Sequence, residues 1–266
     1  MRSVDYRTQT TLITGASSGI GAEFARQLAQ QGSALVLVAR RAERLEALAA
    51  ELSRAHGVQV TVIPLDLSRP SAGQTLAAEV ASRGVTVTSL INNAGFATYG
   101  PFHEEDPQRV SEELSLNVAN LVDVARAFIE PLRAAGSGVL INVASVAAYQ
   151  PIPNMAVYAA SKAFVLSFTE ALWQESRGTG LRVIALSPGV TRTEFFDVIG
   201  TDGTTGGTSF QSPAEVVDTA LRALDRRQPP PSVVSGSANR ALTLSGRLVS
   251  RRFLVLAAAF RTRPKR

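Results

Sequence analysis

Short runs of consecutive apolar residues recur along most of the chain, and helix-forming stretches separate them. The runs are rich in valine, isoleucine and leucine, as expected for strands that are buried on both faces of a parallel sheet. They occupy Thr10–Ile13, Ser33–Ala39, Gln59–Leu65, Ser89–Ile91, Gly138–Ala144 and Leu181–Leu186, with a last short strand at Ser232–Ser235. This alternation predicts an α/β fold, a single-domain doubly wound parallel sheet of Rossmann-like type with helices on both faces.

The same pattern divides the chain into a domain of residues 1–235 and a tail of residues 236–266. Near the end of the domain, Ser212 and Pro213 predict a helix start, because serine caps helices and proline suits their first turn. The glycine-rich stretch Gly200–Thr208 lies in a segment, about residues 190–212, that we expect to act as a lid. A surface insertion with no role in binding is the alternative.

The first predicted strand runs directly into a glycine-rich turn and then a helix. The turn reads Thr14-Gly15-Ala16-Ser17-Ser18-Gly19-Ile20-Gly21. Glycines permit tight turns and close approach of the backbone, and the helix that follows offers free N–H groups to a pyrophosphate. The arrangement predicts dinucleotide binding, and a purely structural turn is the alternative.

The residues after the second predicted strand bear on the choice of cofactor. NAD-binding sites usually place an acid about 20 positions after the glycine turn, where it binds the ribose 2′-hydroxyl. No acid occurs between Glu23 and Glu43, whereas Ala39 is followed by Arg40 and Arg41. Because guanidinium groups bind phosphate in a bidentate manner, this pattern favours NADP(H) over NAD(H). Two solvated arginines at the head of a helix are the alternative.

A hydroxyl, a phenol and an ammonium lie close together between residues 145 and 162. Ser145 follows the fifth predicted strand, at the edge where open α/β sheets bind ligands. Tyr158 and Lys162 lie one turn apart on one face of a predicted helix. A nearby ammonium lowers the pKa of a phenol, which would prepare Tyr158 for acid–base chemistry. Since the chain has only two lysines, this position favours a functional pair over a buried aromatic beside a solvated charge.

Composition argues against several other kinds of site. The chain has no cysteine, which excludes disulfides and thiolate chemistry, and its two histidines, His56 and His103, make a metal site unexpected. No run approaches the roughly 20 apolar residues needed to cross a bilayer, and the N-terminus lacks the apolar core of a signal peptide. We therefore expect a cytoplasmic protein without a metal.

Taken together, these positions resemble the short-chain dehydrogenase/reductase family over roughly residues 8–235. The matching motifs are Thr14-Gly15-x-x-x-Gly19-x-Gly21, Asp66, Asn92-Asn93-Ala94-Gly95, Asn117, Ser145, Tyr158-x-x-x-Lys162 and Pro188-Gly189-x-x-x-Thr193. The resemblance implies four catalytic residues. They are Asn117, Ser145, Tyr158 and Lys162. By this resemblance, Ser145 would orient the substrate oxygen and Tyr158 would act as general acid/base. Asn117 would hold a water in a proton relay with Lys162.

The resemblance also implies a cofactor site, with Asp66 near the adenine and Thr193 at the nicotinamide carboxamide. The expected cofactor-binding residues are Gly15, Ser17, Ser18, Gly19, Ile20, Gly21, Arg40, Arg41, Asp66, Leu67, Asn93, Ala94, Gly95, Tyr158, Lys162, Pro188, Gly189, Val190 and Thr193.

The sequence thus predicts an NADP(H)-dependent oxidoreductase that interconverts a carbonyl and a secondary alcohol by hydride transfer. Apolar residues close to the site in sequence favour an apolar small-molecule substrate. They are Phe96, Tyr99, Phe102, Tyr149, Ile152, Met155, Phe195 and Phe196. A place in the core or in an oligomer contact is the alternative for each of them. We expect a homo-oligomer, a dimer or tetramer, and no nucleic-acid partner. A non-catalytic NADP-binding sensor or scaffold is the alternative, although a sensor needs the glycine turn and no proton donor.

The tail differs from the rest of the chain in charge. Residues 1–225 carry a net charge of −5, whereas residues 226–266 contain ten basic and no acidic residues. A helix over Arg240 to Phe260 would be amphipathic. Its apolar stripe would hold Leu242, Val249, Phe253, Leu256 and Phe260, opposite Arg240, Arg247 and Arg251. Such a helix either lies on an anionic membrane surface or packs on the body or on another subunit.

Overall fold

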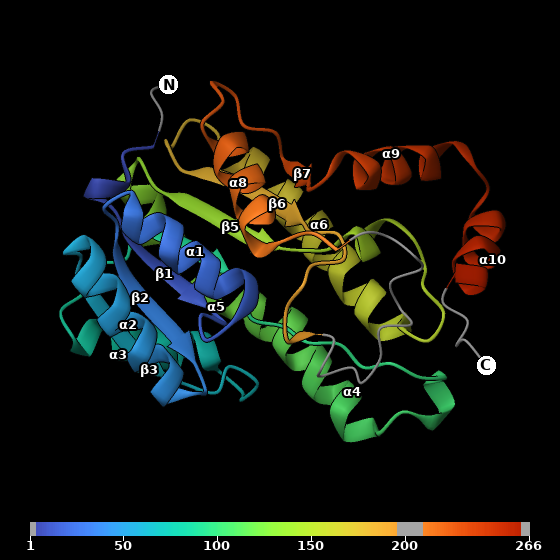
Figure 1. Ribbon diagram of the computed structural model, residues 1–266, viewed down its shortest axis with the longest axis horizontal. Coiled ribbons are helices and arrows are strands. Elements are labelled where there is room, and N and C mark those ends of the chain that lie inside the picture. Colours follow the sequence, from blue (N-terminus) through green and yellow to red (C-terminus); the bar gives the residue numbers. More distant parts are fainter. Residues whose placement is uncertain (1–3, 196–209, 262–266) are drawn as a thin grey trace.

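The chain folds into a seven-stranded parallel sheet between two layers of helices (Figure 1). The computed structural model describes residues 4–195 and 210–261. The strands are β1 (Thr10–Thr14), β2 (Ala34–Ala39), β3 (Val60–Pro64), β4 (Ser89–Asn92), β5 (Val139–Val143), β6 (Arg182–Ser187) and β7 (Ser232–Val234). They lie in the order β3-β2-β1-β4-β5-β6-β7, and every neighbouring pair is parallel. This confirms the predicted doubly wound, Rossmann-like α/β fold.

Helices connect successive strands and continue beyond the last one. They are α1 (Gly19–Gln30), α2 (Ala42–His56), α3 (Ala72–Ser82), α4 (Pro107–Leu114), α5 (Asn120–Ala135), α6 (Ala156–Glu175), α8 (Pro213–Leu224), α9 (Ser237–Ser245) and α10 (Arg251–Arg261). Short 3₁₀ turns occur at Tyr6–Thr8, Phe102–Glu104, Val146–Tyr149 and Gly246–Leu248, and a π-helical turn, Ser115–Ala119, joins α4 to α5. Within the two described ranges, no helix is long and apolar enough to cross a membrane.

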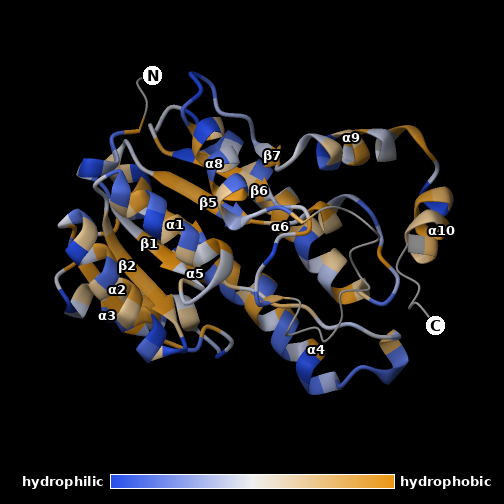
Figure 2. Cartoon of the chain, in the orientation of Figure 1, coloured by the Kyte–Doolittle hydropathy of each residue, from blue (hydrophilic) through white to orange (hydrophobic). Residues whose placement is uncertain are grey.

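The two faces of the sheet are covered by different helices. Helices α1, α2 and α8 cover one face, and α3, α5 and α6 cover the other. Because successive side chains of a strand point to opposite faces, Ile13 enters the first core and its neighbour Leu12 enters the second. Figure 2 shows the result as apolar strands enclosed by helices whose outer faces are polar.

The order of the strands places the predicted motifs at one edge. The chain leaves β1 for β2 and β3 on one side and later returns to β4 on the other, which creates a switch point between β1 and β4. Strand register aligns the carboxyl ends, with Ile13 beside Ile91 and Val143 beside Leu186. The segments that follow β1, β4, β5 and β6 therefore meet in one place.

Helix α8 begins as predicted. The Ser212 hydroxyl accepts a hydrogen bond from the Glu215 N–H at 3.2 Å, and the Glu215 carboxylate accepts one from the Ser212 N–H at 2.7 Å. This reciprocal arrangement is a capping box, and Pro213 occupies the first helical position. Of the segment predicted to be a lid, residues 196–209, which include Gly200–Thr208, lie outside the described residues.

The tail forms two helices, so the prediction of one continuous helix from Arg240 to Phe260 is wrong. Helix α9 ends at Ser245, one 3₁₀ turn follows, and Val249 is extended with φ −118° and ψ 158°. Gly246 is a poor helix former, and the Ser250 hydroxyl accepts a hydrogen bond from the Phe253 N–H at 3.3 Å. Ser250 thereby caps α10 and favours a new helix over continuation of the old one.

The predicted apolar stripe of the tail is divided by this break. Leu242 is partly buried and, with Leu254 of α10, lines a small cavity against the Val146–Tyr149 turn. The remaining stripe residues are exposed, at 40% for Val249, 59% for Phe253, 60% for Leu256 and 76% for Phe260. Leu242 therefore packs on the chain's own body, whereas Val249, Phe253, Leu256 and Phe260 do not pack on it. For these four residues the predictions of a membrane surface or of another subunit remain.

Candidate active site

A cleft of about 450 Å³ opens at the carboxyl ends of β1, β4, β5 and β6, within the usual size range of small-molecule sites. The structure brings most of the predicted site residues together there. They are Gly15, Ser17, Ser18, Gly19, Ile20, Arg40, Arg41, Asp66, Leu67, Asn93, Ala94, Gly95, Ser145, Tyr158, Lys162, Pro188, Gly189, Val190 and Thr193. The other two, Gly21 and Asn117, lie behind the lining of the cleft.

The glycine turn after β1 forms a cradle that side chains would fill. Gly15 and Gly19 have positive φ angles of 66° and 56°, which favour glycine. A Cβ atom on Gly19 would come within 2.9 Å of the Thr193 methyl group, and one on Gly15 would come within 2.8 Å of the Asn93 amide. Gly21 packs against the Gly15 carbonyl inside the turn. The cradle and the N-terminus of α1 fit a pyrophosphate group.

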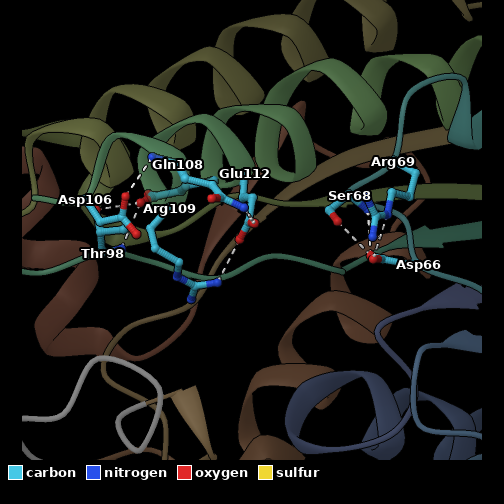
Figure 3. A network of polar contacts seen from close by, with 9 residues as sticks. Asp66, Ser68, Arg69, Thr98, Asp106, Gln108, Arg109 and Glu112 are labelled. Carbon is cyan, nitrogen blue, oxygen red and sulfur yellow. Dashed lines mark hydrogen bonds and ion pairs between the residues drawn. The ribbon is translucent and has the colours of Figure 1, made fainter.

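Asp66 lies on the next part of the cleft wall, just after β3 (Figure 3). Its Oδ1 atom accepts hydrogen bonds from the Ser68 N–H at 3.0 Å and the Ser68 hydroxyl at 2.8 Å. Partial burial raises the pKa of Asp66, but these bonds and the positive charges of Arg40 and Arg69 outweigh it and lower that pKa. The carboxylate is thus an ionised acceptor, suited to an exocyclic amino group.

The adjacent arginines Arg40 and Arg41 interact with different residues of the cleft. The charge of Arg40 acts on Asp66, whereas Arg41 binds the glycine turn. Arg41 donates from Nε to the Ser17 hydroxyl at 3.1 Å, and from Nη2 to the Ser17 and Ser18 hydroxyls, both at 2.9 Å. A guanidinium and two hydroxyls therefore converge beside the glycine turn, as a phosphate site requires.

Ser145, Tyr158 and Lys162 line the cleft from two elements that follow β5. Ser145 caps the Val146–Tyr149 turn, accepting a hydrogen bond from the Ala147 N–H at 3.1 Å. Tyr158 and Lys162 lie in the first two turns of α6, with the ammonium 5.8 Å from the centre of the phenol ring. The Lys162 ammonium donates a hydrogen bond to the Val143 carbonyl at 2.8 Å, which fixes it against the end of β5.

Burial dominates the electrostatics of these groups. It raises the pKa of Tyr158 to about 12, although the hydrogen bond with Ser145 opposes the rise, and the nearby Glu113 adds to it. Burial also lowers the pKa of Lys162 to about 8, against the opposing effect of Glu113. The predicted lowering of the Tyr158 pKa by Lys162, to which a bound cationic nicotinamide could add, is therefore not seen in the chain without a cofactor, because desolvation dominates that pKa.

Asn117 lies in the π-helical turn between α4 and α5, a kind of irregularity often found at functional sites. Its side chain is fully buried, donates to the Phe96 carbonyl at 2.8 Å and to the Ser161 hydroxyl at 3.2 Å, and accepts from the Phe96 N–H at 3.2 Å. Gly95 separates it from Lys162, since a Cβ atom on Gly95 would lie 2.8 Å from Asn117 Oδ1 and 3.4 Å from Lys162 Nζ. Asn117 and Lys162 thus share one small space behind the cleft.

Two carboxylates near the site were not predicted. Glu113 is fully buried one helical turn before Asn117, and its Oε2 atom accepts from the Thr98 N–H and hydroxyl, both at 2.8 Å. That spacing was the signal available in the sequence. Glu194 follows Thr193 and binds Arg41 at 2.8 Å, with Arg44 on its other oxygen. No local pattern connects Glu194 to an arginine 153 positions away.

Of the eight apolar residues predicted near the site, four line the cleft, and Tyr99 is half-buried outside the cleft lining. Phe96, Ile152, Met155 and Phe195 line the cleft, and the Phe195 ring lies 5.4 Å from that of Tyr158. Phe102 is 66% exposed, and Tyr149 lines the small cavity under α9. Phe196 lies outside the described residues. The cleft therefore has apolar lining residues, and one of them, Phe195, lies against Tyr158.

The sequence and the fold are similar to those of known proteins. The profile of the short chain dehydrogenases matches residues 9–203. Sulfoacetaldehyde reductase 2 of Chromohalobacter salexigens is 40% identical over 80% of this chain and 83% of that protein, and 7beta-hydroxysteroid dehydrogenase of Collinsella aerofaciens is 30% identical over 86% of each. A short-chain dehydrogenase from Sphingobium yanoikuyae, solved in complex with NADPH, superposes with a TM-score of 0.78 at 36% identity and covers 90% of this chain and 93% of its own.

The chain belongs to the short-chain dehydrogenase/reductase family. It is an oxidoreductase, of a family that acts on alcohols and carbonyl compounds, and its similarity to structures with bound NADPH or NADP supports a nicotinamide cofactor. A non-catalytic sensor or scaffold is accordingly set aside.

Proposed function

We propose that the protein is an NADP(H)-dependent oxidoreductase that interconverts a carbonyl and a secondary alcohol, with Tyr158 as general acid/base. The observation that supports this most directly is that Ser145, Tyr158 and Lys162 line the same cleft as the glycine turn. A bound nicotinamide cofactor supplies the hydride in reduction and accepts it in oxidation.

In reduction, the Ser145 hydroxyl donates a hydrogen bond to the substrate oxygen and fixes it beside Tyr158. The Tyr158 hydroxyl then gives its proton to that oxygen as negative charge develops. A buried phenol with a pKa of about 12 is fully protonated at neutral pH, so it is ready to act as the acid. The Lys162 ammonium, held by Val143, stabilises the phenolate that results. In oxidation the same groups act in reverse.

In this proposal, the preference for NADP(H) is caused by the side chains that line the cleft beside the glycine turn. Ala39 brings no carboxylate to the end of β2, and the Arg41 guanidinium converges with the Ser17 and Ser18 hydroxyls. Three donors in this arrangement suit the 2′-phosphate, which distinguishes the phosphorylated cofactor. Arg40 adds positive charge nearby, through its effect on Asp66.

The proposed substrate is a small, largely apolar carbonyl compound or alcohol. Phe96, Ile152, Met155 and Phe195 form an apolar part of the cleft wall, and the Phe195 ring lies 5.4 Å from the Tyr158 ring. The curated relatives are named for substrates as different as sulfoacetaldehyde and hydroxysteroids, so similarity alone selects no substrate. The wall favours the apolar end of that range.

We also propose that the enzyme is a homo-oligomer whose tail contacts an anionic lipid surface. The exposed apolar residues of α10 and the wholly basic charge of residues 226–266 support the lipid contact. The alternative is that a second copy of the chain binds the same surface, and vesicle binding distinguishes this alternative from the lipid contact.

The test of the proposed activity is a panel of carbonyl compounds and alcohols assayed through the absorbance of NADPH. The panel should include steroids, aliphatic ketones and anionic aldehydes. We expect turnover with apolar ketones and loss of it in Tyr158→Phe. Turnover restricted to anionic aldehydes would contradict the apolar substrate, and turnover that is unchanged in Tyr158→Phe would contradict the mechanism.

A further inference from the structure

The carboxylate of Glu194 binds the arginine that the proposed function assigns to the cofactor phosphate. Its Oε2 atom accepts a hydrogen bond from Arg41 Nη1 at 2.8 Å, and its Oε1 atom contacts the Arg44 guanidinium. Hydrogen bonds from Arg44 and Arg41 lower the pKa of Glu194 to about 2. Glu194 is thus an anion at every pH at which the enzyme would be assayed.

The position of Thr193 brings its neighbour Glu194 close to Arg41, although the two are far apart in the sequence. The Thr193 methyl group lies over the glycine turn, close to where a side chain on Gly19 would be. The segment after β6 therefore crosses the cleft, and its residues 193–194 lie at the glycine turn and near the start of α2. Glu194 lines the cleft itself, so its carboxylate lies inside the site.

Arg41 is the point at which two anions would meet. Its Nε and Nη2 atoms bind Ser17 and Ser18, and its Nη1 atom binds Glu194. A phosphate that uses the same guanidinium has to displace the carboxylate or accept its repulsion at short range. The 2′-hydroxyl of an unphosphorylated ribose meets no such repulsion, and a carboxylate is the acceptor that NAD-binding sites place here.

We propose that Glu194 occupies the place of the 2′-phosphate on Arg41 and thereby reduces the preference of the enzyme for NADP(H) over NAD(H). This inference rests on the proposed use of Arg41 for the phosphate. Glu194 acts as a specificity-determining residue. It supplies an acid to this part of the site, where the residue at the end of β2, Ala39, has none. The net preference is then the balance between Arg40 and Arg41 on one side and Glu194 on the other.

The test is a comparison of cofactor affinities in Glu194→Gln and the wild-type enzyme. NADPH and NADH are titrated separately by the change in their fluorescence, without substrate. We expect the ratio of the NADH to the NADPH dissociation constant to rise by about threefold to fivefold, the upper part of the range for an interaction between partly exposed charges. A ratio that rises by less than threefold, or that falls because Glu194 merely positions Arg41, overturns the inference.

Glu51→Gln is the matched control. Glu51 also pairs with an arginine, Arg26 at 3.0 Å, and is similarly exposed, but it lies on α2 away from the cleft lining. Its removal changes the net charge equally and should leave the ratio unchanged. A ratio shifted as much by Glu51→Gln would show a general charge effect and would also overturn the inference.

A second variant tests whether Glu194 acts through Arg41. In an Arg41→Ala background, Glu194→Gln should change the ratio by less than about threefold, because the shared guanidinium is gone. A full effect without Arg41 contradicts the inference. Failure of the proposed function is seen separately, in a wild-type enzyme that binds NADH as tightly as NADPH, since the inference is judged only by the shift between variants.

Discussion

At the scale of single residues, the chemistry depends on two ionisable groups whose pKa values are moved in opposite directions by burial. Lys162 is 4% exposed, and Tyr158 lies beside it on α6. The lowered pKa of Lys162 and the raised pKa of Tyr158 both mean that burial favours the uncharged form of each group in the cofactor-free site. Two variants examine these groups separately.

Tyr158→Phe removes the only proton donor that the proposal assigns to the substrate oxygen. We expect turnover to fall by at least about a hundredfold, the usual contribution of general acid catalysis, because Ser145 can orient the oxygen but would remain a weak acid. NADPH affinity should change by less than about threefold, since the phenylalanine ring fills the same volume. Steady-state kinetics and a binding titration measure the two effects, and near-normal turnover would contradict the mechanism.

Lys162→Met tests the cost of burying the ammonium. The Lys162 pKa is about 8 in the folded chain and 10.5 as the ordinary value, so between these pH values the unfolded chain binds more protons. The free energy of unfolding of the wild-type protein should therefore rise with pH across this window, and Lys162→Met lacks this contribution. The difference between wild type and variant should grow in favour of wild type by on the order of 2 kcal/mol from about pH 7.5 to pH 10.

Urea unfolding of both proteins at the two pH values measures this difference. The raised pKa of Tyr158 acts in the opposite sense, but it does so above about pH 10 and in both proteins alike. A difference that stays constant with pH would mean that Lys162 titrates in the folded chain as it does in the unfolded one.

At the scale of elements, the sequence predicted what local periodicity determines. The inner strands are short apolar runs buried on both faces, and the Ser212 capping box depends on neighbouring residues, so both were predictable. The division of the tail was not, because the periodicity of apolar residues continues through Gly246 and does not register that Ser250 caps a second helix. The contact of Glu194 with Arg41 was not predictable either, since only the order of the strands brings β6 and α2 to one cleft.

The loop between β4 and α4 gives a prediction at this scale. Gly95→Ala would place a methyl group 2.8 Å from Asn117 Oδ1 and 3.4 Å from Lys162 Nζ, too close for the first contact. We expect turnover to fall at least about tenfold, because the methyl group fills the space that Asn117 and Lys162 share, with about 1–3 kcal/mol of overpacking cost. Turnover and the thermal midpoint are measured together.

Gly100→Ala is the control for that variant. Among the described residues, a methyl group there would meet only the Glu105 side chain, at an ordinary 3.8 Å. It should leave turnover and stability nearly unchanged. Equal losses in the two variants would mean that the loop tolerates no added methyl group anywhere, and the specific role of the space beside Asn117 would be refuted.

At the scale of the whole molecule, charge and exposure single out the tail. The first 225 residues carry −5, and all ten charged residues after them are basic. Helices α9 and α10 extend away from the sheet and its covering helices (Figure 1), and α10 exposes Phe253, Leu256 and Phe260. Large exposed apolar side chains next to arginines are typical of helices that lie in a lipid interface.

The tail is tested by cosedimentation of the full-length protein with lipid vesicles. Binding is expected to vesicles that contain phosphatidylserine and not to pure phosphatidylcholine, and to weaken with salt, because each basic residue near an anionic surface contributes about 1 kcal/mol. The double variant Phe253→Ser, Leu256→Ser should lose most of this binding, whereas Phe102→Ser, which removes an equally exposed phenylalanine outside the tail, should retain it. Sedimentation velocity of the same proteins tests the alternative, a subunit interface. If the wild type does not bind anionic vesicles at low salt and the double substitution dissociates an oligomer, the apolar face of α10 belongs to a subunit interface. The lipid proposal is then wrong.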